Sequence, residues 1–89
     1  MGEAYWQAIG ENEAFNAYLG QFPALADTVS QKVDIVGRTL DATSALELAA
    51  GRDAMSGLHM IAHEAGFVAL AALFYESYEG FCSRLMQYL

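Results

Sequence analysis

The two histidines of this sequence lie four residues apart and are the side chains best suited to chemistry. His59 and His63 both fall within GLHMIAHEAGF, residues 57–67. Residues four apart on an α-helix lie on neighbouring turns of one side. A histidine ring in water is largely neutral at physiological pH, so one nitrogen is a nucleophile while the other can donate a hydrogen bond. Such a ring can accept a phosphoryl group if a donor protein can reach it.

The apolar residues of the same segment predict where the two rings point. At 100° per residue, four apolar residues share one face of a helix, which we expect to face the core: Met55, Leu58, Ala62 and Ala65. His59 lies about 90° from the centre of that face and His63 about 130° from it. We therefore expect both rings at the edge of the core or in solvent. The alternative interpretation is a pair of surface histidines with no function.

The residues after His59 resemble a known family. HMIAHEAGFVALAAL, residues 59–73, contains Ala-Gly-Phe and two spaced leucines, a pattern similar to that of histidine-containing phosphotransfer (HPt) domains and of the phosphotransfer domains of chemotaxis kinases. The resemblance covers a bundle over residues 15–85, with its motif confined to residues 58–73. It implies a cytoplasmic phosphorelay intermediate of a two-component system, with no cofactor, no kinase activity of its own, and a response-regulator receiver domain or a histidine kinase as partner.

The motif also departs from that family. Such domains carry Lys three residues after the acceptor and Gly four residues after it, where this chain has Ala62 and His63 if His59 is the acceptor. If His63 is the acceptor, Gly66 and Phe67 occupy those positions. We favour His59 and keep His63 as the alternative acceptor. The missing cation supports a second hypothesis, a phosphate-incompetent bundle of HPt descent that binds a kinase or receiver.

Other chemistries find less support in the sequence. Two histidines at this spacing can chelate a metal, but Met60 follows His59 where zinc proteases have Glu, so a metal-binding bundle is a third interpretation. The lone Cys82 is expected to pack as a small hydrophobe. The chain lacks both a Gly-x-Ser-x-Gly elbow and a phosphate-binding glycine loop, so hydrolase and nucleotide-dependent kinase activities are not expected.

Composition restricts the partners. Eleven acidic residues against four basic ones give a net charge of −7, and the bases are scattered. Nucleic acids and anionic membranes require a basic surface, so neither is an expected partner. One cysteine and no secretory-type leader predict a reducing cytoplasm. The longest apolar run near the C-terminus, residues 65–75, is shorter than the ~20 residues that span a bilayer.

Hydrophobic spacing predicts helices almost throughout the chain. A stripe over residues 25–40 predicts a helix that Pro23 begins. Ser44 and Glu47 have the spacing of a capping box, so a third helix should start at Ala45 and either continue to about residue 65 or divide at Gly51. Apolar residues from 67 to 88 predict a final, mostly buried helix.

The remaining segment completes the predicted fold. Residues 5–22 suggest a helix that covers one end of the core, with Gly10 as a candidate break. Strand signals are absent. With 89 residues, 55% of them hydrophobic, we expect one domain, residues 1–89, folded as an all-α, antiparallel, up-down four-helix bundle. The sequence does not indicate its oligomeric state.

Overall fold

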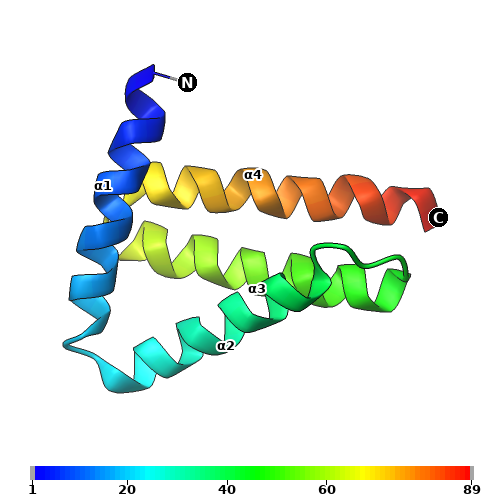
Figure 1. Cartoon of the computed structure of the whole chain (residues 1–89), viewed down its shortest axis with the longest axis horizontal. Coiled ribbons are helices and arrows are strands. Elements are labelled where there is room, and N and C mark those ends of the chain that lie inside the picture. The colour runs from blue at the N-terminus through cyan, green and yellow to red at the C-terminus, as the bar shows by residue number, and fades with distance from the viewer. Residues whose placement is uncertain (1, 89) are drawn as a thin grey trace.

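Four α-helices make up the part of the chain that the structure describes. A computed structural model describes residues 2–88 (Figure 1). The helices are α1 (Gly2–Leu19), α2 (Pro23–Thr39), α3 (Ala45–Glu64) and α4 (Val68–Leu85), followed by a 3₁₀ turn, η1 (Met86–Tyr88). The described residues contain no strand, which confirms the all-α prediction. None of the helices described combines the length and apolar character needed to cross a membrane.

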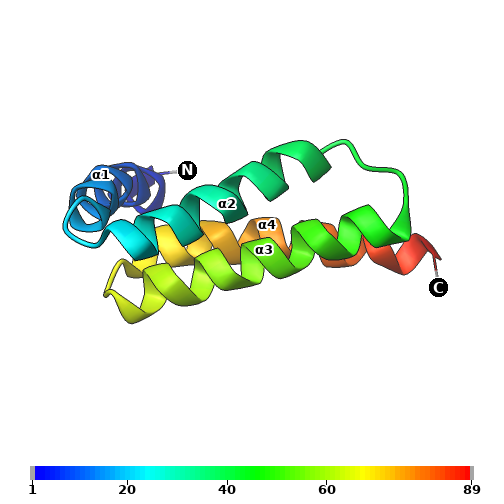
Figure 2. The same ribbon diagram turned by 90° about the horizontal axis from the view of Figure 1, so that it is seen from below.

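The helices form two layers. The molecule measures 39 × 33 × 19 Å, and its shortest dimension accommodates two helices of about 10 Å diameter. α3 and α4 lie side by side in one layer, while α2 packs over α3 and α1 lies across one end of the other three (Figures 1 and 2). The N-terminal helix therefore covers an end of the core as expected. The up-down antiparallel order expected for all four helices is not confirmed, because α1 crosses its neighbours.

Contacts with α4 hold α1 in its crossing position. Phe15 is buried and meets the ring of Phe67 edge-on at a centroid distance of 5.4 Å. The Glu11 Oε1 atom accepts a hydrogen bond of 2.9 Å from the backbone N–H of Leu70. Phe67 stands at the N-cap of α4 without a capping side chain, so the Glu11 carboxylate satisfies an N–H group that α4 itself leaves open.

The ends of α3 follow the local sequence. The Ser44 hydroxyl accepts a 3.3 Å hydrogen bond from the Glu47 N–H and donates one of 2.9 Å to the Glu47 carboxylate, which confirms Ser44 as the N-cap and the start at Ala45. The helix then runs unbroken past Gly51 to Glu64. Gly66 adopts a positive φ of 91°, a backbone conformation that glycine tolerates and that ends the helix. α1 is likewise continuous through the candidate break.

All four helices contribute residues to the core. Gly51 lies at a close approach of α2, α3 and α4, because a Cβ atom there would lie 2.5 Å from Thr39 Oγ1 of α2 and 2.7 Å from Phe81 Cζ of α4. The glycine thus lets three helices approach closely instead of dividing α3. The buried cluster consists of Phe15, Leu19, Val29, Leu48, Met55, Leu58, Ala62, Leu70, Ala71 and Phe81.

Candidate functional site

Both histidines project from the C-terminal half of α3. Leu58 and Ala62 are 2% and 0% exposed, and their burial fixes the rotation of the helix about its axis. His59 is consequently half-buried and His63 exposed, as the helical wheel predicts. At least one imidazole is therefore open to solvent.

A hydrogen bond to α4 orients the ring of His59. Its Nδ1 atom lies 2.8 Å from the backbone oxygen of Ala71. A carbonyl oxygen only accepts, so the neutral ring carries its proton on Nδ1 and leaves the lone pair of Nε2 free. Ala71 is buried in the α3–α4 interface, and its carbonyl can accept this second bond because it has two lone pairs.

Two tyrosines of α4 extend the histidine pair into a row of four adjacent rings, in the order His63, His59, Tyr75 and Tyr78. The ring of His59 lies 5.8 Å from that of His63 and 5.2 Å from that of Tyr75, and Tyr75 stacks on Tyr78 at 5.5 Å. The sequence predicted only a mostly buried helix over residues 67–88, whereas Tyr75 is exposed and Tyr78 half-buried. The available signal for the row was their spacing of three residues, which places both tyrosines on one side of α4.

The row ends near Cys82 and Arg52. A side-chain hydrogen bond with Cys82 raises the pKa of Tyr78 above its usual value, and the adjacent thiol adds to this electrostatically. Cys82 is partly exposed, so it is less enclosed than the packed small hydrophobe that was expected. The Arg52 guanidinium binds the Asp53 carboxylate at 3.0 Å, and this hydrogen-bonded pair raises the pKa of Arg52.

Neither histidine has a basic residue at the position that the HPt pattern requires. Ala62, three residues after His59, is fully buried, so a lysine there would enter the core. Gly66, three residues after His63, follows the end of α3. Arg52 stands seven residues before His59, about 10 Å along the helix axis. A phosphoryl group on either ring would therefore lack an adjacent cation from the family motif.

The histidine pair offers two nitrogen ligands but no third protein ligand. No three His, Cys, Asp or Glu side chains within residues 2–88 are grouped so that they could hold a metal ion.

Comparisons with family models, with curated proteins and with solved structures gave no match to this chain. The similarity to HPt domains therefore stands on the residues between Leu58 and Leu73, and membership of that family is a proposal.

Proposed function

We propose that this protein is a phosphorelay intermediate in which His59 accepts a phosphoryl group from the aspartate of a receiver domain and returns it. The observation that supports this role is the bond between His59 Nδ1 and the Ala71 oxygen. It holds the ring in the tautomer whose Nε2 lone pair is nucleophilic, on a side chain that is only half-buried. The proposal treats α2, α3 and α4 as an antiparallel scaffold for this ring.

The transfer needs no base in this chain. The Nε2 lone pair of His59 attacks phosphorus, an N–P bond forms, and the P–O bond to the partner's aspartate breaks and leaves a carboxylate. The proton stays on Nδ1, so the ring gains positive charge as the bond forms. The Ala71 carbonyl faces that proton, and its dipole stabilises the charge. The reverse steps return the phosphoryl group.

His63 is the alternative acceptor. It is exposed on the next turn of α3, and its ring centroid lies 5.8 Å from that of His59. Its accessibility favours docking of a donor, whereas the fixed tautomer favours His59. The two rings therefore make different predictions for single substitutions.

Phosphorylation with two kinds of donor tests the proposal. The purified chain is incubated with phosphoramidate, a small donor independent of partner identity, and with a panel of phosphorylated receiver domains. Acid-labile phosphate is measured by intact mass and by ³¹P NMR. We expect His59→Gln to lower the labelling at least about tenfold, because it removes the nucleophile, and His63→Gln to preserve it. Labelling that neither substitution lowers, or no labelling from any donor, contradicts the proposal.

A second function is favoured by the burial of Ala62. Because this position faces the core, the chain cannot present the lysine that supports phosphate in the HPt pattern. The same bundle would then act as a binding module that occupies a kinase or receiver surface without carrying phosphate. This alternative predicts a complex with a receiver or kinase that survives His59→Gln, together with no phosphohistidine in the experiment above.

A further inference from the structure

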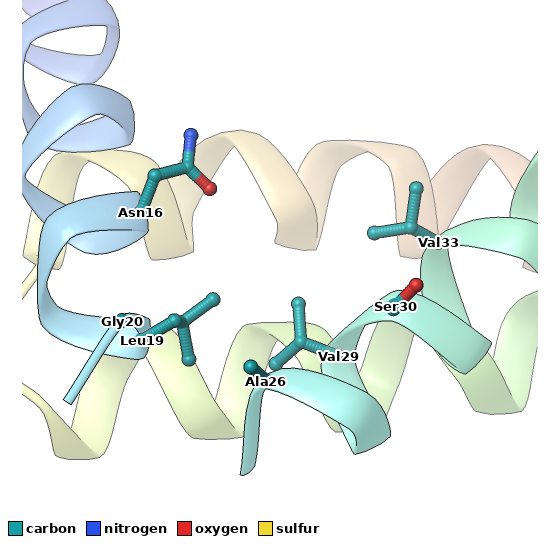
Figure 3. A pocket seen from close by; sticks show the side chains of 7 residues that line it. All are labelled: Asn16, Leu19, Gly20, Ala26, Val29, Ser30 and Val33. Carbon is teal, nitrogen blue, oxygen red and sulfur yellow. The ribbon is translucent and has the colours of Figure 1, made fainter. Parts of the chain in front are cut away.

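A hollow of about 390 Å³ lies between the end of α1 and the face of α2, and no residue of α3 or α4 lines it (Figure 3). Leu19, Val29 and Val33 supply its apolar surface, and Asn16 and Ser30 its polar side chains. It is therefore separate from the histidine site, which α3 and α4 form.

The hollow exists because α1 lies across the bundle. α1 packs mainly on α4 and meets α2 only near the short connection between them (Figure 1), so part of the apolar stripe of α2 has no cover. Val29 is 7% exposed, whereas Val33, one turn further, is 54% exposed. α4 passes behind the opening in Figure 3. The apolar stripe of α2 thus extends beyond the helices that bury it.

The hollow is lined by uncharged residues, and acidic residues lie next to them in the chain. Exposed carboxylates neighbour the lining residues in the chain, with Glu13 one turn before Asn16 on α1 and Asp27 and Asp34 next to Ala26 and Val33 on α2. Lys32, which precedes Val33, lies against Gly57 of α3. Of the carboxylates, Asp34 pairs with Arg38 at 3.6 Å across an exposed turn, and the whole chain carries −7. An apolar strip between acidic edges is complementary to a helix whose apolar face is flanked by Lys and Arg.

We propose that this hollow binds a cationic amphipathic helix of a partner protein. The α2 lining from Ala26 to Val33 spans about 10 Å, or two helical turns, which suits apolar anchors spaced three or four residues apart. The small residues Gly20, Ala26 and Ser30 let a helix axis approach to the usual 8–10 Å. A second copy of this chain is a poorer occupant, because two acidic edges would face each other.

Display of a peptide library tests the proposal without knowledge of the partner. Eighteen-residue helices with a fixed Leu/Ala face and randomised flanking positions are selected against the full chain. We expect Lys and Arg to be enriched at the flanks. Val33→Arg fills the hollow and repels the cations, so it should weaken the selected peptides at least about tenfold. Leu46→Arg makes the same change at a site 83% exposed on α3 and should leave binding unchanged; circular dichroism verifies that both variants fold.

Each other result overturns the proposal. No enriched peptide, enrichment of neutral or acidic flanks, or equal loss of binding in the two arginine variants would each exclude a cationic helix at this surface. Sedimentation equilibrium of the chain alone provides a further check. A dimer that Val33→Arg dissociates would assign the hollow to a second copy instead of a partner.

Discussion

Gly51→Ala is the substitution for which the structure makes the sharpest prediction of stability. The new methyl group would lie 2.5 Å from Thr39 Oγ1 and 2.7 Å from Phe81 Cζ, far inside van der Waals contact. Neither neighbour yields easily. Phe81 is 3% exposed, and the Thr39 hydroxyl is held by a 2.8 Å hydrogen bond to the Ile35 oxygen. The methyl group therefore has to displace a packed ring or break that bond.

Two opposing effects determine how much Gly51→Ala changes the free energy of unfolding. Overpacking a core costs about 1–3 kcal/mol, and the upper end applies because both neighbours are fixed. Replacing glycine by alanine within a helix raises the free energy of unfolding by about 1 kcal/mol, because alanine has the higher helix propensity. We expect a net loss of about 2 kcal/mol, which lowers the melting temperature of a chain of this size by about 10 °C. Thermal and urea unfolding followed by circular dichroism measure both quantities.

Two controls isolate the clash from helix propensity. Gly10 and Gly80 also lie within helices, but a Cβ atom at either would meet nothing within 4 Å. Alanine at these positions should stabilise the protein by about 0.5–1 kcal/mol. Phe81→Leu should relieve part of the clash, so its combination with Gly51→Ala should cost less than the sum of the single changes. Stabilisation by Gly51→Ala, or strict additivity in the double variant, would refute the close approach of the three helices.

Two further predictions concern α4. Glu11→Ala should destabilise the protein by about 1 kcal/mol and accelerate hydrogen exchange of the Leu70 amide, because that N–H loses its acceptor, and Glu11→Gln should cost less; an unchanged exchange rate would contradict the cap. The raised pKa of Tyr78 means that the unfolded chain releases this proton first as the pH rises. The free energy of unfolding should therefore fall more steeply above about pH 10 in the parent protein than in Tyr78→Phe, as urea titrations at each pH would reveal, and equal slopes would contradict a raised value.

Part of the candidate site could be predicted because it depends on one helix. The apolar face of α3 fixes its rotation, and the observed exposure of His59 and His63 follows from their angles to that face. The bond from His59 to Ala71 could not be predicted, since its partner lies on another helix and is a backbone carbonyl that every residue possesses. The same apolar face predicted that Ala62, at a motif position, packs in the core, and its full burial confirms this.

The sequence by itself determined that four segments are helical and where α2 and α3 begin, because propensity, capping and apolar periodicity act between residues a few positions apart; it left open whether Gly10 and Gly51 divide their helices. Examples of these local signals are Pro23 at the start of α2, Ser44 with Glu47 at the start of α3, and the apolar stripes on α2 and α4. Only the tertiary structure decided that α1 crosses the bundle, that Gly51 admits two neighbouring helices, and that a hollow remains beside Val33. Those outcomes depend on contacts such as Glu11 with Leu70, whose partners are distant in the chain and whose energies count only once the helices have packed.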